Sequence, residues 1–328
     1  MAVETRRHPA LPGPQFRTKF GHCVQCRHFV SQATRQAAPS ASSLAIVVVN
    51  FNSGAHLGKC LQSIAECAPH AAVIVVDNAS CDGSERAAAA DVGRVTLLRN
   101  HANLGFAKAV NQGLAVSQSP LVMLLNPDCL LLPGVVSALE AELGTHRDCA
   151  IAAPAILNDD GTIQGNLRGD PTIWTGLFGR TTLLTRLLPR SRLSRRNVPT
   201  ASGTPLSGAS VSADWVSGAC VLARREALEA VGGLDERYFL YWEDADLCRR
   251  LRQRGYTTRY VPAGRVVHRV GGSSQSARGL AIRAFHQSAY TYYATHVARG
   301  TMSRGVARLL LAARCQWKLW ATGAARQS

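Results

Sequence analysis

Residues 44–52 read LAIVVVNFN, an apolar run rich in β-branched side chains that ends in two asparagines. A run that is apolar at nearly every position is typical of a strand in a parallel sheet with helices on both faces. A helical pattern follows, with Leu57, Leu61 and Ile64 on one face. We therefore predict a strand and then a helix, the repeating unit of a parallel α/β sheet.

The same alternation continues to residue 157. Further apolar, strand-like runs occupy residues 72–80, 95–100, 120–129 and 149–157. Helices are predicted between them: one within residues 81–90 with Asp82 or Ser84 as its N-cap, one after Gly105 and one from Pro133. Strands that alternate with helices in this way predict a doubly wound, mostly parallel α/β sheet.

Polar side chains follow four of these predicted strands at the point where each strand ends. They are Asn50, Asn52, Asp77, Asn78, Asn100, Asn103, Asn126 and Asp128. In open parallel sheets ligands bind at the carboxyl ends of the strands, so these residues mark a binding site. The sequence lacks the G-x-G-x-x-G turn after its first strand and the P-loop pattern. Phosphates would therefore be bound in another way. The simplest is through a hard cation that is held by Asp128.

A second candidate site lies in residues 215–274, where Tyr241-Trp242-Glu243-Asp244-Ala245-Asp246 places three carboxylates behind two aromatic side chains. Carboxylates that are crowded in this way are costly to ionise together, so a cationic group is expected nearby. Glu243 is predicted to begin a helix that ends before Gly255, where carboxylates can simply cap the helix. The alternative is that one of them is a general base. Asp246 is expected to cap the helix or to pair with Arg249 or Arg250.

Composition restricts the class of protein. The 328 residues carry a net charge of +16, and the basic residues are concentrated near the two ends. Such a charge is suited to binding anionic lipid or nucleic acid, or it can belong to solvated tails without a binding role. Nucleic-acid binding predicts basic residues interleaved with aromatic ones, and this sequence lacks that pattern. The scattered cysteines indicate a reducing compartment, and Cys23-x-x-Cys26 lacks a second ligand pair for zinc. The sequence shows no secretory signal and no apolar run of transmembrane length.

Three further segments have a distinctive residue composition. Residues 1–43 are predicted to be a disordered basic extension. Residues 180–196 alternate Leu with Arg and predict either an amphipathic surface helix or a mobile loop over the acceptor site. Residues 276–328 are predicted to form C-terminal amphipathic helices. Within them, 302–320 combines Arg, Leu and two Trp, which favours contact with a membrane surface over packing on the chain's own domain.

Taken together, the motifs resemble those of a known enzyme family. VVVNFNSGAHLGKCLQSI, VVDNAS, N-x-G-F-A-x-A-V-N-Q-G, LLNPD, SGAC, GGLDERYFLYWEDADLCRRL and H-x-x-GGSS occur in this order over residues 44–300. This set resembles the family 2 glycosyltransferases, and within them the rhamnosyltransferase-type group. The resemblance implies the GT-A fold, with a catalytic domain over residues 44–275. Residues 44–130 would be its nucleotide-sugar half and residues 131–275 its acceptor half.

The resemblance also implies roles for individual residues. The residues expected at the nucleoside and sugar are Asn50, Asn52, Asp77, Asn78, Asn103, Gly105 and Asn111. Asp128 and His268 would bind Mg²⁺ or Mn²⁺, although Asn126 replaces the first Asp of the family's Asp-x-Asp motif. Asp244 would be the catalytic base beside Glu243, and Trp242 would shape the acceptor site.

The implied function is inverting transfer of a sugar from a nucleoside diphosphate sugar to a hydroxyl of a lipid-linked or cell-surface glycan precursor. The favoured donor is dTDP-rhamnose, followed by UDP-sugars. The enzyme would act at the inner, cytoplasmic face of the cell membrane through peripheral contact, and it would not bind nucleic acid. The alternative is a non-catalytic nucleotide-sugar or glycan-binding module of the same fold. That alternative requires a broken Asp128, Asp244 and His268 set, and all three residues are present.

Overall fold

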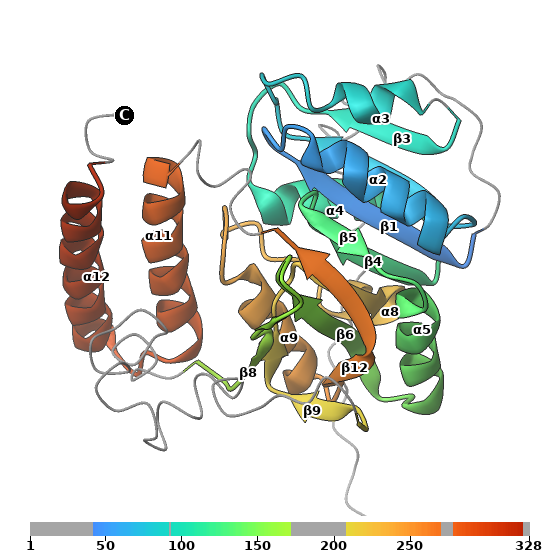
Figure 1. Ribbon diagram of the computed structural model, residues 1–328. Coiled ribbons are helices and arrows are strands. Elements are labelled where there is room, and N and C mark those ends of the chain that lie inside the picture. Colours follow the sequence, from blue (N-terminus) through green and yellow to red (C-terminus); the bar gives the residue numbers. More distant parts are fainter. Residues whose placement is uncertain (1–41, 92, 172–207, 270–277, 324–328) are drawn as a thin grey trace, which may run out of the picture. The chain divides into compact units, whose positions relative to one another are not determined.

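The computed structural model describes residues 42–91, 93–171, 208–269 and 278–323, all within the compact unit Pro39–Ser328. Figure 1 shows their arrangement. The Cys23-x-x-Cys26 pair, nearly all of the predicted basic extension and the segment 180–196 lie outside the described residues.

The described strands form one ten-stranded sheet and one two-stranded sheet. In the large sheet the strands are β1 (Leu44–Asn50), β2 (Ala72–Asp77), β3 (Val95–Arg99), β4 (Leu121–Leu125), β5 (Cys129–Leu131), β6 (Cys149–Leu157), β7 (Ile163–Gln164), β9 (Val211–Ala213), β11 (Cys220–Arg224) and β12 (Thr257–His268). The small sheet pairs β8 (Leu167–Arg168) with β10 (Trp215–Val216).

The order of the strands places a switch point at β1. The main path is β3-β2-β1-β4-β11-β6-β12-β5, and β1 pairs in parallel with both β2 and β4. The chain therefore leaves β1 toward one side and later returns to the other, which opens a crevice at the carboxyl end of β1. The doubly wound, mostly parallel sheet predicted from the sequence is confirmed.

Several local predictions differ from the structure. Strand β11, which lies antiparallel between β4 and β6, was not predicted, and neither were the short strands β5, β8, β9 and β10. The runs TTRYVPA (257–263) and RVVHRV (265–270) predict two strands, but residues 257–268 form one strand, β12, whose pairing with β6 shifts in register between Val261 and Arg265. The predicted N-cap was also wrong. Helix α3 (Arg86–Ala90) begins after Glu85 without a side-chain cap, because Asp82 instead accepts hydrogen bonds from the backbone N–H groups of Ser84 and Gly54.

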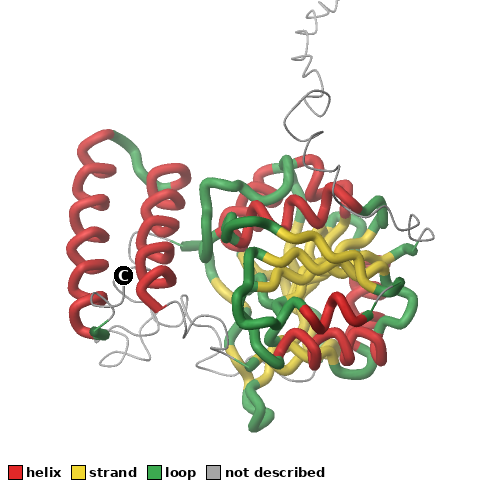
Figure 2. The backbone as a smooth tube through the Cα atoms, turned by 90° about the horizontal axis from the view of Figure 1, so that it is seen from above, coloured by secondary structure: helices red, strands yellow, loops and turns green. Residues whose placement is uncertain are grey.

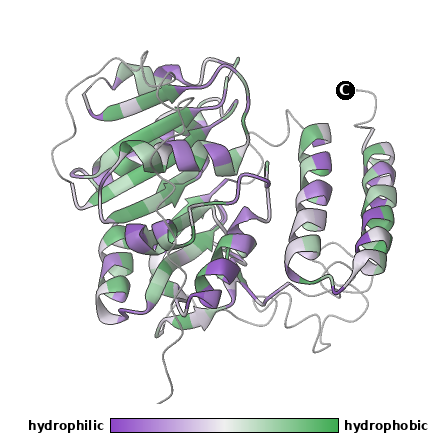
Figure 3. Cartoon of the chain, turned by 180° about the vertical axis from the view of Figure 1, so that it is seen from behind, coloured by the Kyte–Doolittle hydropathy of each residue, from purple (hydrophilic) through white to green (hydrophobic). Residues whose placement is uncertain are grey.

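Helices cover both faces of the large sheet, as Figure 2 shows. One face packs on α2 (His56–Cys67), α3 and α5 (Val135–Thr145), and the other on α4 (Phe106–Val116), α8 (Arg225–Ala230) and α9 (Glu243–Gln253). Within β1, Ile46 and Val48 belong to the first core, whereas Ala45 and Val47 belong to the second. This two-residue alternation explains why the whole strand is apolar. The strands are accordingly coloured as hydrophobic in Figure 3.

Two long helices complete the described chain. They are α11 (Arg278–His296) and α12 (Thr301–Ala321), and they pack side by side (Figure 1). In α12 Leu319 is buried, while several large apolar side chains are exposed. No helix among the described residues is long and apolar enough to cross a membrane.

Candidate active site

The first part of the site is a polar network that joins the carboxyl ends of β1 and β2. Asn50 is fully buried, and its Nδ2 donates to Asp77 Oδ1 at 2.7 Å and to the hydroxyls of Ser80 and Ser84. The Asp77 carboxylate also accepts from the backbone N–H and the hydroxyl of Ser80. The side chain of Asn50 is therefore directed at its neighbours, where it holds Asp77 in place. A nucleoside contact by either residue stays a prediction.

The neighbouring asparagines extend this network toward α4. Asn78 is buried, its Nδ2 donates to the carbonyl of Gly105 at 3.1 Å, and its Oδ1 accepts from Asn100. Asn103 Oδ1 accepts from the backbone N–H of Gly105. Half-buried Asn52 lies at the rim, where its Oδ1 accepts from the N–H of Cys81. The predicted strand-end residues thus lie close together, and most of their side chains form hydrogen bonds that hold the neighbouring loops in place.

Gly105 and Asn111 contact the segment that precedes α9. Gly105 has a φ of 88°, and a Cβ added there would lie 2.6 Å from the carbonyl oxygen of Phe239, which accepts a hydrogen bond from the N–H of Phe106. Only glycine fits such a close approach. Asn111 was expected near the ribose and sugar. Its side chain instead donates to the carbonyl of Leu234 and accepts from the N–H of that residue.

The candidate metal site lies where β4, β5 and β12 meet. Asp128 follows β4, His268 ends β12, and their Oδ1 and Nε2 atoms are 3.3 Å apart. The ligand atoms of Asp128, Cys129 and His268 all lie within 4.8 Å of one another. Cys129 is a poor ligand because burial raises the pKa of its thiol well above the ordinary value and the thiol faces the carbonyl of Ala219. Asp128 Oδ1 is buried and receives no hydrogen bond from the described residues, so the pair fits a cation.

The acidic pair of the second half lies at the start of α9. Asp244 accepts hydrogen bonds from the backbone N–H groups of Gly218 at 3.1 Å and Ala245 at 2.8 Å. Within the described residues no donor reaches the buried Oε2 atom of Glu243. Burial raises the pKa of Glu243 well above its usual value, and the adjacent Asp244 charge raises it further. Burial also raises the pKa of Asp244. Because only Asp244 has two N–H donors, the first negative charge of the pair belongs there.

The aromatic residues before this pair adopt a strained backbone. Tyr241 and Trp242 have φ values of 68° and 71°, which non-glycine residues adopt rarely. This turn directs the Trp242 ring toward α11. The centroid of the ring lies 5.9 Å from the ring centroid of Phe285 and 5.3 Å from that of Tyr292. Burial raises the pKa of Tyr241, and the charges of Glu243 and Asp128 raise it further.

Asp246 has the structural role that the sequence predicted. Its carboxylate is fully buried, and Oδ2 pairs with Arg250 at 2.6 Å. Oδ1 faces His296 Nε2 at 2.6 Å and accepts from the hydroxyl of Tyr238 at 3.3 Å. Through its contact with His296, Asp246 thus joins α11 to α9 two residues after the acidic pair.

Comparison with known proteins decides the family. Residues 39–301 match the family model described as glycosyltransferase like family 2. The chain belongs to the family 2 glycosyltransferases. It is similar to the N-acetylglucosaminyl-diphospho-decaprenol L-rhamnosyltransferase of Mycobacterium tuberculosis, with 32% identity over 76% of this chain and 84% of that one. A shorter match, 37% identical, covers 25% of this chain and 31% of the rhamnosyltransferase WbbL of Escherichia coli. These likenesses confirm the rhamnosyltransferase-type group.

Solved structures confirm the fold of this glycosyltransferase. A mannosyltransferase from Pyrobaculum calidifontis, solved with GDP-Man and Mn²⁺, has a TM-score of 0.52 and 16% identity and covers 92% of this chain and 85% of that one. GalNAc-T7, solved with UDP, GalNAc and Mn²⁺, has a TM-score of 0.53 and 19% identity and covers 70% of this chain and 44% of that one. At these identities the likeness establishes the GT-A fold.

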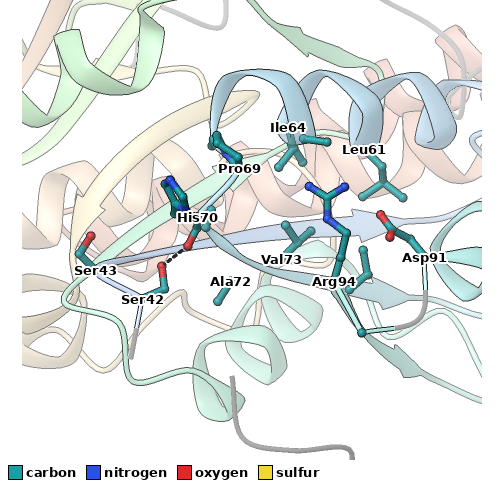
Figure 4. Close-up of a pocket in the computed structure, with 15 residues that line it drawn as sticks. Ser42, Ser43, Leu61, Ile64, Pro69, His70, Ala72, Val73, Asp91 and Arg94 are labelled. Carbon is teal, nitrogen blue, oxygen red and sulfur yellow. Dashed lines mark hydrogen bonds between the residues drawn. The ribbon is translucent and has the colours of Figure 1, made fainter. Parts of the chain in front are cut away.

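A surface pocket of the glycosyltransferase lies away from these residues. The pocket, of about 570 Å³, is lined at the amino ends of β1, β2 and β3 by Ser42, His70, Asp91 and Arg94, among others (Figure 4). It includes none of the predicted site residues. Since ligands of such sheets bind at the carboxyl ends of the strands, this pocket is not the active site.

Sequence reasoning did not single out three residues that lie at the candidate site. Cys129 was noted only as a buried thiol, and Tyr241 only as an aromatic neighbour of the acidic cluster. Gln164 lies on β7, and its side chain contacts both the ring and the main chain of His268. The sequence contains no local signal for this contact, because the partners are 104 positions apart.

Proposed function

We propose that the enzyme transfers a sugar, with inversion, from a nucleoside diphosphate sugar to a hydroxyl of a lipid-linked glycan precursor. The favoured donor is dTDP-rhamnose. The carrying observation is the Asp244 carboxylate, which is held by two backbone N–H groups beside an acid with a strongly raised pKa. The donor is supported by the likeness to the M. tuberculosis enzyme, whose name specifies L-rhamnose transfer to N-acetylglucosaminyl-diphospho-decaprenol. In this proposal residues 44–130 hold the donor and residues 131–275 the acceptor.

Asp244 is the proposed general base. An attacking hydroxyl loses its proton to the base as it bonds to the anomeric carbon, and the diphosphate leaves from the opposite face. The base must be ionised, and the hydrogen bonds from Gly218 and Ala245 stabilise that form. Glu243, whose raised pKa favours the neutral acid, then adds no second negative charge beside it.

Asp128 and His268 are the proposed ligands of Mg²⁺ or Mn²⁺. When bound, the cation would offset the negative charge that grows on the diphosphate. The carboxylate of Asp128 suits both ions, and the imidazole of His268 favours Mn²⁺. The related folds solved with Mn²⁺ support a divalent ion. Asn126, in place of an acid, reduces the negative charge of this site.

A panel of donors tests the proposal. Release of nucleoside diphosphate is measured with dTDP-rhamnose, UDP-glucose, UDP-GlcNAc and UDP-galactofuranose, each with an N-acetylglucosaminyl-diphospho-lipid acceptor. We expect the highest kcat/KM with dTDP-rhamnose, a product of inverted anomeric configuration, and loss of turnover in EDTA that added Mn²⁺ restores. A higher kcat/KM with any UDP-sugar would refute the donor assignment, and a retained configuration would refute the mechanism.

We further propose that α12 contacts an anionic membrane surface. At 3.6 residues per turn its exposed large apolar side chains share one stripe, about 100° wide. They are Met302, Val306, Leu309, Leu310, Trp317 and Trp320. The helix also carries Arg and Lys without any acidic residue. An apolar stripe with interfacial Trp and basic neighbours favours a helix that lies in the headgroup region. The eight described cysteines are free thiols, which supports the cytoplasmic face.

Vesicle binding tests this contact. The double variant Leu309→Ser/Trp320→Ser removes two exposed side chains, each worth about 1.5–3 kcal/mol when buried in lipid. We expect wild type to sediment with vesicles that contain phosphatidylglycerol, and the double variant to bind at least about 10-fold more weakly. Gln316→Ala, an exposed polar change on the same helix, serves as the control. Equal binding by wild type and the double variant would contradict the proposal.

A further inference from the structure

Gln164 makes two contacts with His268, and no motif of the sequence contains it. Gln164 lies on β7, which pairs antiparallel with the end of β6. Its Nε2 atom donates to the main-chain oxygen of His268 at 2.6 Å, and its Oε1 atom lies 3.0 Å from the ring Nδ1 of the same residue. One side-chain amide therefore contacts both the backbone and the ring of a proposed metal ligand.

These contacts determine which ring nitrogen carries the proton. A main-chain oxygen can only accept, so the amide nitrogen of Gln164 must face it, and the amide oxygen then faces Nδ1. Because an amide oxygen also only accepts, Nδ1 must carry hydrogen. In the neutral ring, Nε2 of His268 is then left with its lone pair exposed.

That lone pair faces Asp128. His268 Nε2 lies 3.3 Å from Asp128 Oδ1, the buried oxygen to which no described residue donates a hydrogen bond. Two acceptors that face one another repel unless a cation lies between them. An imidazole whose other N–H donates to an acceptor is the usual arrangement of a metal-bound histidine.

The backbone places His268 but leaves the orientation of its ring open. In the register of β12 with β5, His268 is opposite Cys129, and the N–H of Arg269 donates to the carbonyl of Asp128. These bonds bring the residue beside Asp128. Among the described groups, the amide of Gln164 is the one that bonds to the His268 ring opposite Nε2.

We infer that Gln164 is a positioning residue: it holds His268 in the Nδ1–H tautomer with Nε2 directed at Asp128, ready for a divalent cation. This inference rests on the metal site of the proposed function. It assigns a specific task to the β6–β7 hairpin, namely to pre-organise a ligand and so raise the affinity for the cation.

The test uses the full-length chain and the variant Gln164→Met, which keeps the length of the side chain but can neither donate to the carbonyl nor accept from the ring. The first measurement is ¹⁵N NMR of the imidazole nitrogens without metal, with His268 assigned through His268→Gln. The second is Mn²⁺ affinity from the electron paramagnetic resonance signal of free Mn²⁺. Thr162→Val is the matched control, because among the described residues Thr162 bonds only to Asn158 and Asp160, on the same hairpin.

We expect wild type and Thr162→Val to show His268 in the Nδ1–H form. Gln164→Met should lose this fixed tautomer and bind Mn²⁺ about 10- to 100-fold more weakly. If Gln164→Met does not fold, Gln164→Asn, whose shorter amide cannot make both contacts, is expected to show the same loss. An unchanged tautomer and Mn²⁺ affinity in the folded variant would overturn the inference. Wild type that binds no Mn²⁺ would instead refute the proposed metal site, and the inference with it.

Discussion

Asp244→Asn is expected to lower kcat for sugar transfer by about 10²–10⁴-fold, the range lost when a general base is removed. Asparagine has nearly the same shape, and its oxygen can still accept from Gly218 or Ala245, so the start of α9 should keep its structure. It cannot take the proton of the acceptor hydroxyl. KM for the donor should change little, because the predicted donor residues lie at the ends of β1 and β2, in the loops after β1, β2 and β3 and on α4, whereas Asp244 lies on α9.

The pH dependence of wild type gives the second readout for this variant. Burial raises the pKa of Asp244 above its ordinary 3.8. Since the base acts in its ionised form, kcat should rise as pH increases through that raised pKa and then level off. The residual activity of Asp244→Asn should lack this rise. Glu229→Gln is the control, since Glu229 is exposed and pairs only with Arg225, at 3.6 Å. Full turnover by Asp244→Asn would remove the residue from the mechanism.

Asp128→Asn is expected to abolish stimulation by Mn²⁺ and to lower kcat/KM by at least about 10²-fold, comparable to the loss of a major electrostatic contact in the transition state. The same substitution should stabilise the metal-free protein. The buried Asp128 Oδ1 faces the lone pair of His268 Nε2 without a donor between them, whereas an asparagine Nδ2 can donate there. A gained hydrogen bond is worth about 1 kcal/mol.

Thermal unfolding with and without Mn²⁺ separates these two effects. Without metal, the Tm of Asp128→Asn should exceed that of wild type by about 2 °C. With Mn²⁺, wild type should gain stability and the variant should not, because a ligand stabilises only the state that binds it. Asp159→Asn is the control, since Asp159 is exposed and pairs with Arg269 beside the end of β12. An Mn²⁺-dependent rise in the Tm of Asp128→Asn equal to that of wild type would refute the role of Asp128.

The first strands and helices of the sheet could be predicted closely because their signals are local. The β-branched run of β1 and the helical spacing of Leu57, Leu61 and Ile64 each lie within one element. The same is true of the Asp246–Arg250 pair, which is four residues apart on α9. Strand β11 was not predicted, and its four apolar residues before Arg224 would suit a strand that runs parallel or antiparallel to β4. Direction within the sheet depends on the course of the chain, which the run itself does not encode.

The orientation of individual side chains in the site could not be predicted in the same way. The amides of Asn50 and Asn111 bond to Asp77 and Leu234, which lie 27 and 123 positions away. Trp242 was expected to shape the acceptor site, and its ring packs on α11. Each of these directions depends on partners that folding brings together.

By itself, the sequence determined the α/β class, the polar ends of the strands, and the acidic helix start that carries the proposed base. Hydrophobic periodicity and the identity of the residue at each strand end are sufficient for these features. Only the tertiary structure showed that Oδ1 of Asp128 and Nε2 of His268 lie 3.3 Å apart, and that the amide of Gln164 contacts the His268 ring. The reason is physical: a buried lone pair is oriented by the donors and acceptors around it, and here these come from β4, β7 and β12.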